Sequence, residues 1–165
     1  MTSPPLLPSV VESSLTGNVT LDDVKVEPPS EHLALFGVAT NLMPGVKHLE
    51  RSKETRKEAF TLVSGHTTEC LLKAIIFKAG TATVSLKDPK LRHNLTELWN
   101  LAASLCLTLG SGVPQWVLTL DEFHDTPYAI RYMKGVHMYS LPPHKLVLVG
   151  LEELFAKTKA FLGCP

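Results

Sequence analysis

The fold follows from one stretch of the chain, TRKEAFTLVSGHTTECLLKAIIFKAG, which spans residues 55–80. Intervals of three and four residues, the period of an α-helix, connect Phe60, Val63, Thr67, Leu71, Ala74 and Phe77 or Lys78. Additional apolar residues between them indicate that the helix is buried on more than one side. Gly80 suits the position just after a helix, because glycine adopts a positive φ without strain. We therefore predict a central helix from about residue 53 or 55 to Ala79.

A first helix is predicted to start at Ser30, a residue type that caps helix N-termini well. Its inward side chains would be Leu33, Leu35, Phe36 and Val38. Pro44 and Gly45 are expected to disturb this helix, because proline lacks the N–H group that a helix interior requires.

Two shorter helices are predicted after the central one. Asp88 followed by Pro89 is a typical helix start, since the carboxylate can cap free N–H groups and proline has none to lose. The apolar stripe that follows consists of Leu91, Leu95, Leu98, Ala102 and Leu105. Pro114 precedes a short amphipathic segment over residues 115–123. Its expected core residues are Trp116, Leu118, Leu120 and Phe123.

The last helix is predicted over about residues 144–162, after an irregular stretch between Asp125 and Pro143. Its inward side chains would be Leu146, Val149, Leu151, Leu154, Phe155 and Ala160. Consecutive helices joined by short connections indicate an all-α, up-and-down bundle of four to five helices.

The composition suits one globular domain. Hydrophobic residues make up 44% of the 165 residues and charged residues 19%, which is enough apolar material for a sizeable core. Residues 1–28 are rich in Pro, Ser and Thr and show no sustained period, so we expect a disordered, flexible tail there. Residues 18–26 could add a short strand to it. Residues 29–165 are then the single helical-bundle domain.

The charge pattern and the cysteines narrow the range of functions. Sixteen basic residues balance sixteen acidic ones, so no overall charge draws the chain to nucleic acid or to anionic membranes. No apolar run approaches the roughly 20 residues that span a bilayer, and the N-terminus lacks the basic region of a secretory signal, so we expect a cytoplasmic protein.

The three cysteines form no CxxC pair, and we expect neither a metal nor a cofactor. Cys70 and Cys106 are expected to act as small core hydrophobes.

The central helix also carries a polar stripe. His66, Glu69 and Lys73 are spaced i, i+3, i+7, which places them on nearly one line along the helix. The stripe is a binding site for a phosphate or another polar ligand, a solvated helix face, or an internal Glu–Lys hydrogen-bond pair. Gly65 precedes it, and the missing Cβ would allow a neighbouring backbone or a ligand to approach closely.

Two further polar groups lie near predicted helix ends. Arg92 and His93 stand near the start of the third helix, where free N–H groups and the helix dipole favour an anion. The alternative is that Arg92 bonds a carboxylate and His93 pairs with Glu97. His124 lies among acidic residues that are adjacent in sequence and not on one helical face, so we interpret it as part of an exposed helix terminus and not as a metal ligand.

The order of these motifs is similar to that of the HEPN family. GHTTECLLKAIIFKAG at 65–80, followed by LRHNLTEL at 91–98, resembles a pattern in which a helix with a Glu and a Leu-Lys-Ala triplet leads to a His-Asp/Asn-Leu helix start. PYAIRYMKG at 127–135 looks like an Arg-Tyr stretch found before the last helix in some bacterial members. The resemblance implies a four- to five-helix bundle that often dimerises. It also implies a nucleotide or RNA ligand and a partner protein from the same operon, as in toxin–antitoxin or nucleotidyltransferase systems.

Many HEPN proteins are metal-independent ribonucleases with an Arg-x4–6-His motif, and Arg131 and His137 match that spacing. In such a pair the histidine exchanges a proton and the guanidinium holds the charge that develops on the phosphate. Our leading hypothesis is a nucleotide- or RNA-binding accessory module, because the polar stripe lies near a helix start without a complete catalytic set. The alternatives are a ribonuclease that uses Arg131 and His137, and a structural homodimer without a ligand.

Overall fold

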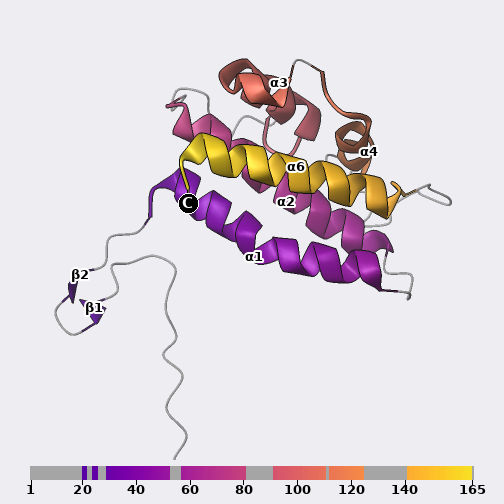
Figure 1. Ribbon diagram of the computed structural model, residues 1–165, viewed down its shortest axis with the longest axis horizontal. Helices are drawn as coiled ribbons and strands as arrows, with labels where there is room; N and C mark the ends of the chain where they lie inside the picture. Colours follow the sequence, from indigo (N-terminus) through magenta and orange to yellow (C-terminus); the bar gives the residue numbers. More distant parts are fainter. Residues whose placement is uncertain are drawn as a thin grey trace, which may run out of the picture.

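The structure is a computed structural model that describes residues 20–21, 24–25, 29–52, 57–80, 91–110, 112–124 and 141–164. Within them the elements follow in the order β1 (Thr20–Leu21), β2 (Val24–Lys25), α1 (Glu31–Arg51), α2 (Lys57–Lys78), α3 (Leu95–Leu105), η1 (Leu107–Leu109), α4 (Gln115–His124) and α6 (His144–Leu162) (Figure 1). The predicted all-helical bundle is confirmed, with five α-helices among the described residues. The two short strands pair antiparallel, within the region where a strand was expected.

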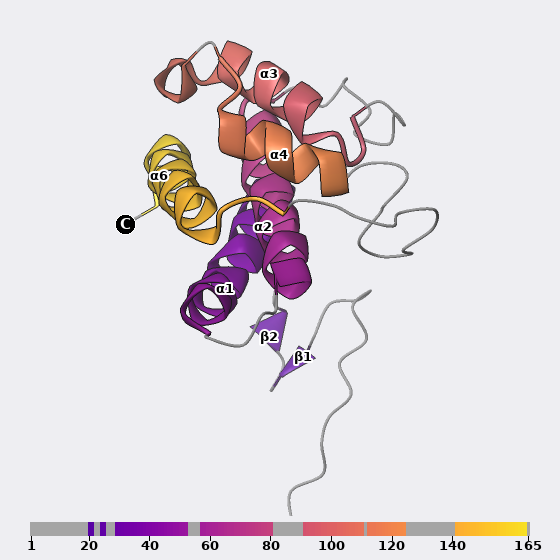
Figure 2. The same ribbon diagram turned by 90° about the vertical axis from the view of Figure 1, so that its right-hand side faces the viewer.

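The bundle is organised around α2, which contacts α1, α3, α4 and α6. Figure 1 shows that α2 and α6 lie alongside α1 and run in the opposite direction to it. Figure 2 shows that α3 and α4 lie across these helices and not along them, so the arrangement differs from a simple up-and-down bundle. At 11 and 10 residues, α3 and α4 are about half as long as the 22-residue α2. We attribute the crossing to this length, since a short helix can bury its apolar stripe against a longer one by crossing it.

The prediction for the central helix is confirmed over Lys57–Lys78, and its predicted start at residue 53 or 55 lies outside the described residues. Phe60, Leu71 and Ile75 of α2 are completely buried, and buried residues occur around most of its circumference. The helix stops at Gly80, which has a φ of 76° and donates its N–H to the carbonyl of Phe77 at 3.1 Å. A residue with a side chain would be strained in this conformation, which explains the glycine.

The prediction for α1 is partly wrong. The helix continues through Pro44 and Gly45 to Arg51. Pro44 is exposed on the outer face, while the opposite face is buried in the bundle. That buried face consists of Ala39, Met43 and Val46. We infer that its packing outweighs the roughly 3 kcal/mol that an interior proline costs. Leu33 and Val38, which were expected to point inward, are 42% and 41% exposed.

The start of α3 also differs from the prediction. Residues 91–94 are not helical, so the start predicted at residues 88–89 is wrong for this part of the chain. Asn94 is the N-cap, and its side chain accepts a hydrogen bond from the N–H of Glu97 at 2.8 Å. Asp121 of α4 caps the next free groups, because its carboxylate accepts the N–H of Leu95 at 2.6 Å and of Thr96 at 3.2 Å. The start of α3 is therefore set partly by a residue of another helix.

The bounds predicted for α4 and α6 agree with the structure to within one residue, but some of the expected core positions are wrong. Leu118 is 36% exposed, Leu146 50% and Val149 56%. Val117 and Val147 are buried in their place. A shift of one position turns a side chain by about 100° around a helix, which is enough to exchange an inner for an outer position. Ala160, also expected inside, is exposed.

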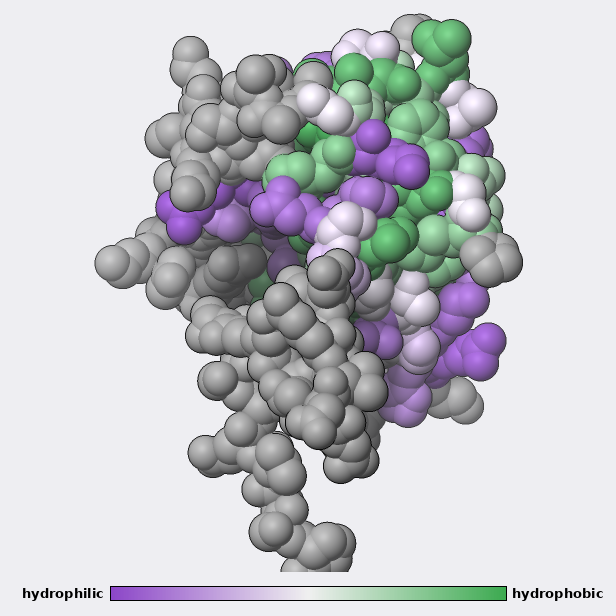
Figure 3. All heavy atoms as spheres, turned by 90° about the vertical axis from the view of Figure 1, so that its left-hand side faces the viewer, coloured by the Kyte–Doolittle hydropathy of each residue, from purple (hydrophilic) through white to green (hydrophobic). Residues whose placement is uncertain are grey.

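Cys70 and Cys106 are buried, as predicted. None of the described helices combines the length and the apolar character needed to cross a bilayer. Figure 3 shows hydrophobic and hydrophilic residues side by side on the end of the bundle that faces left in Figure 1. Single exposed apolar side chains of this kind are normal on protein surfaces.

His144, the first residue of α6, stacks on Phe60 of α2 with ring centroids 4.1 Å apart. Its Nε2 atom is buried and has no hydrogen-bond partner among the described residues. Burial and the charge of Lys57 lower the pKa of His144 below its ordinary value of 6.5, although Glu50 acts in the opposite direction. The folded state therefore favours the neutral imidazole.

We expect the protein to lose stability as the pH falls through 6.5, because the unfolded chain then binds a proton that the folded chain takes up only at lower pH. His144→Phe keeps the stacked ring and removes this titration. The free energy of unfolding in urea, compared between about pH 7.5 and about pH 5.5, should fall less in the variant than in the wild type. Equal losses in both proteins would contradict the prediction.

Candidate metal centre

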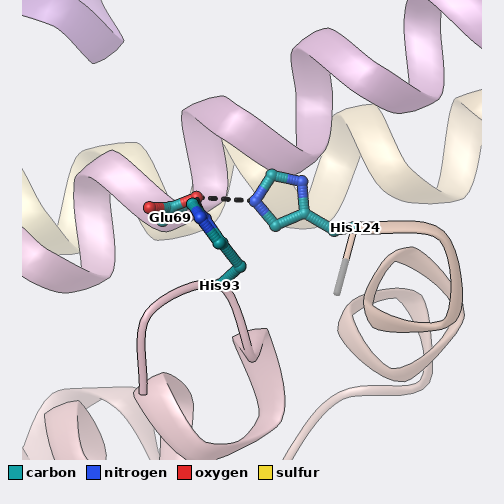
Figure 4. Close-up of side chains that lie close together, drawn as sticks. All are labelled: Glu69, His93 and His124. Atoms are coloured by element: carbon teal, nitrogen blue, oxygen red, sulfur yellow. Dashed lines mark hydrogen bonds and ion pairs between the residues drawn. The ribbon is translucent and has the colours of Figure 1, made fainter. Parts of the chain in front are cut away.

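A buried carboxylate, that of Glu69, lies where α2 meets the end of α4 and the turn before α3 (Figure 4). Its Oε2 atom lies 2.6 Å from Nε2 of His124 and 3.2 Å from Nδ1 of His93. Its Oε1 atom accepts a hydrogen bond from Nζ of Lys73 at 2.5 Å. Both carboxylate oxygens are thus engaged by basic side chains from three separate segments of the chain.

The helical spacing of α2 accounts for one side of this cluster. Glu69 and Lys73 are four residues apart, so they lie on the same face and form the internal pair that was one interpretation of the polar stripe. Nζ of Lys73 also donates to the backbone carbonyl of Arg92 at 2.8 Å, which ties the turn before α3 to α2. His66 is exposed, and its Nε2 atom lies 3.9 Å from Sγ of Cys70.

The turn before α3 supplies one of the two imidazoles that contact Glu69, that of His93. His93 directly precedes the N-cap Asn94, and the pairing seen in the structure is with Glu69, 24 residues earlier in the chain. Its side chain is 22% exposed, more than any other side chain of the cluster. The rings of His93 and His124 meet edge to face, with centroids 6.0 Å apart.

His124, the last residue of α4, supplies the other imidazole. Its side chain is only 2% exposed, so the expected exposed helix terminus is wrong. The ring lies directly against Gly65, where an added Cβ would be 2.7 Å from Nδ1. The close approach predicted at Gly65 is therefore that of an imidazole. Gly65 and Glu69 are four residues apart on one helix face, and this pattern is the sequence signal that could have pointed to a buried partner.

The expected anion site at the start of α3 is filled from within the chain. The Asp121 carboxylate accepts the free N–H groups of Leu95 and Thr96, and also the hydroxyl of Thr96 at 2.5 Å. It therefore occupies the position that the helix dipole favours for a negative charge. Arg92 adds its carbonyl oxygen to the cluster, while its side chain is exposed.

The electrostatics of the cluster favour an ionised carboxylate. Burial by itself would raise the pKa of Glu69, but hydrogen bonds with His124, Lys73 and His93, together with the charge of Lys73, outweigh burial and hold that pKa well below its usual range. Burial and the nearby negative charge of Glu69 raise the pKa of the Cys70 thiol to about 11, so this thiol stays neutral.

Glu69, His93 and His124 can each offer one donor atom to a metal ion, and these atoms all lie within 4.8 Å of one another. Zn²⁺ binds such nitrogen and oxygen donors at about 2.0–2.2 Å, which puts neighbouring donors about 3.3–3.6 Å apart in a tetrahedral site. The distances of 2.6 and 3.2 Å from Oε2 to the two imidazole nitrogens are shorter, so an ion would replace these hydrogen bonds and move the donors slightly apart. Two histidines and one carboxylate are also the donor set of many catalytic zinc and non-haem iron sites.

The structure brings together four of the predicted ligand-binding residues, namely Glu69, Lys73, Arg92 and His93, and adds His124, which the sequence analysis did not assign to the site. Arg131 and His137 lie outside the described residues. No family model, curated protein or solved structure matches the chain. The chemistry of the site therefore has to be inferred from its own residues.

Proposed function

We propose that this protein is a binding module that holds a divalent transition-metal ion between Glu69, His93 and His124. The observation that carries the proposal is the convergence of one carboxylate oxygen and two imidazole nitrogens within 4.8 Å. The two histidines stand 24 and 55 residues after the glutamate in the chain. Such a convergence requires α2, the turn before α3 and the end of α4 to pack together.

The donor set and its surroundings support a transition metal in particular. Imidazole nitrogens suit Zn²⁺, Fe²⁺, Co²⁺ and Ni²⁺, whereas Mg²⁺ and Ca²⁺ prefer oxygen donors throughout. The low pKa of Glu69 keeps the carboxylate in the anionic form that a metal requires. The hydrogen bond that Lys73 donates to Oε1 orients the carboxylate and leaves Oε2 directed at the two histidines.

The proposal includes the resemblance to the HEPN family. Glu69 belongs to the motif at residues 65–80 that carries the resemblance, and His93 belongs to the motif at residues 91–98. We propose that the centre belongs to a HEPN-like accessory module in the cytoplasm. In this proposal the module has a nucleotide or RNA as its ligand, and a second copy of the chain or an operon partner is bound to it. The ribonuclease alternative, with Arg131 and His137, predicts RNA cleavage in EDTA that His137→Ala abolishes.

Titration of the metal-free protein with Co²⁺ is expected to show one bound ion per chain, with visible absorption bands typical of mixed nitrogen and oxygen ligands. His93→Ala should weaken the affinity about 100-fold or more, because loss of an outer-shell partner already costs roughly 10–100-fold. His93 is the most exposed of the three ligands, so its replacement disturbs the fold least. His124→Ala and Glu69→Gln should have the same effect on metal affinity.

The matched control is His48→Ala, which removes an exposed histidine of α1 and should leave Co²⁺ binding unchanged. Circular dichroism should confirm that each variant is folded before it is titrated. A folded wild type that gives no Co²⁺ bands, or equal affinities in the His48 and His93 variants, would refute the metal site. Glu69 would then be only the hydrogen-bonded centre of a structural cluster.

A further inference from the structure

The charges around the proposed centre do not balance once a metal ion is bound. Glu69 carries one negative charge and Lys73 one positive charge, and the two side chains are only 7% and 14% exposed. A divalent ion next to this pair leaves about two positive charges in a largely buried place, which is costly unless an anion joins them. The Asp121 carboxylate already binds the N–H groups at the start of α3.

The centre also has room in its coordination sphere. Structural zinc sites are closed by four protein ligands, whereas three protein ligands leave a position for water or for an external ligand. The side chains of His124 and Glu69 are almost completely buried, while those of His93 and Lys73 are 22% and 14% exposed. An external ligand would therefore reach the ion from the side of His93 and Lys73.

That side carries the donors that suit a phosphate group. Among the described residues, Nζ of Lys73 donates to Glu69 and to the Arg92 carbonyl, and an ammonium group has three hydrogens to donate. The Arg92 side chain is exposed in the same turn, and a guanidinium group binds phosphate oxygens in pairs. A phosphate monoester carries a charge of about −1.5 to −2 at neutral pH, which matches the excess positive charge.

We propose that the metal centre binds the phosphate group of a small ligand, with the phosphate on the metal ion and against Lys73 and Arg92. This inference rests on the proposed metal site and names the class of its ligand. A carboxylate or hydroxide would leave one positive charge uncompensated, whereas a phosphate dianion compensates both. Metal and phosphate should accordingly bind with positive coupling, each raising the affinity for the other by the same factor.

The test is a Co²⁺ titration in sodium chloride and, at the same ionic strength, in inorganic phosphate, with the free ion concentration measured in each sample. We expect phosphate to tighten Co²⁺ binding by about 5- to 150-fold, the usual range of coupling between two sites. A parallel series with AMP distinguishes a nucleotide from free phosphate, because added contacts to the nucleoside would strengthen the coupling further.

Three variants identify the residues that carry the coupling. Lys73→Met removes a positive charge and also the hydrogen bond that orients Glu69, so its Co²⁺ affinity in chloride serves as its own reference, and against that reference it should lose most of the phosphate effect. Arg92→Ala keeps the backbone carbonyl that accepts from Lys73, and should bind Co²⁺ normally in chloride with a weaker phosphate effect. Lys78→Met, at the exposed end of α2, is the control and should behave like the wild type.

The outcomes separate the two proposals. Failure to bind Co²⁺ in either medium would overturn the metal site and, with it, the phosphate site. Co²⁺ binding that is equally tight in chloride and in phosphate would overturn only the phosphate site. A phosphate effect that survives unchanged in both Lys73→Met and Arg92→Ala would also overturn it, because the ligand would then bind elsewhere.

Discussion

Replacing Glu69 with leucine is expected to lower the free energy of unfolding by about 3–5 kcal/mol, as is typical when one partner of a buried ion pair is removed. The substitution removes the acceptor of the His124 imidazole and the charge partner of Lys73, which keeps its hydrogen bond to the Arg92 carbonyl, and these side chains are only 2% and 14% exposed. Urea denaturation in EDTA would measure the loss without any contribution from bound metal.

Glu152→Leu is the matched control for this change. Glu152 also accepts from a lysine, Lys47, at 2.8 Å, but the two side chains are 45% and 44% exposed. Exposed pairs contribute between about 0 and 1 kcal/mol, so the control should be close to the wild type. If Glu69→Leu lowered the free energy of unfolding no more than Glu152→Leu does, the prediction would be contradicted.

Gly150→Ala is expected to lower the free energy of unfolding by about 1–3 kcal/mol through overpacking, although alanine is the better helix former. A Cβ at this position of α6 would lie 2.2 Å from Nε1 of Trp116 and 2.4 Å from its Cε2. The indole ring has little freedom to move, because Trp116 is 7% exposed and meets Trp99 edge to face at 6.1 Å.

Gly45→Ala in α1 separates this clash from the general preference for alanine in helices. A Cβ at Gly45 would meet nothing within 4 Å, so this variant should gain about 0.5–1 kcal/mol. Thermal and urea unfolding of both variants gives the comparison. If Gly150→Ala were as stable as the wild type, the packing of Trp116 against α6 would have to differ from the one described.

Local patterns in the sequence were sufficient to locate most helices. The bounds of α6 follow from apolar periodicity, and the end of α2 follows from Gly80, which has a positive φ. The start of α3 could not be predicted in this way. It depends on Asp121, which accepts hydrogen bonds from residues 25 and 26 positions earlier in the chain.

The inner faces of α1 and α6 were predicted less well than their bounds. Apolar residues occur on several sides of these helices, so periodicity does not identify the single face that packs. Leu146 and Val149 are as hydrophobic as Val147, yet only Val147 lies in the core. The choice depends on where the neighbouring helices lie, and above all on α2, which both helices contact.

The sequence by itself determined the all-helical fold, the central position of α2, and the placement of Glu69 and Lys73 on one face of that helix. These features depend on spacing within one helix, which is readable from residue order. Only the tertiary structure decided that His93 and His124 converge on the same carboxylate oxygen. That convergence depends on how α3 and α4 cross α2, because contacts between residues 24 and 55 positions apart arise from packing and leave no periodic trace in the chain.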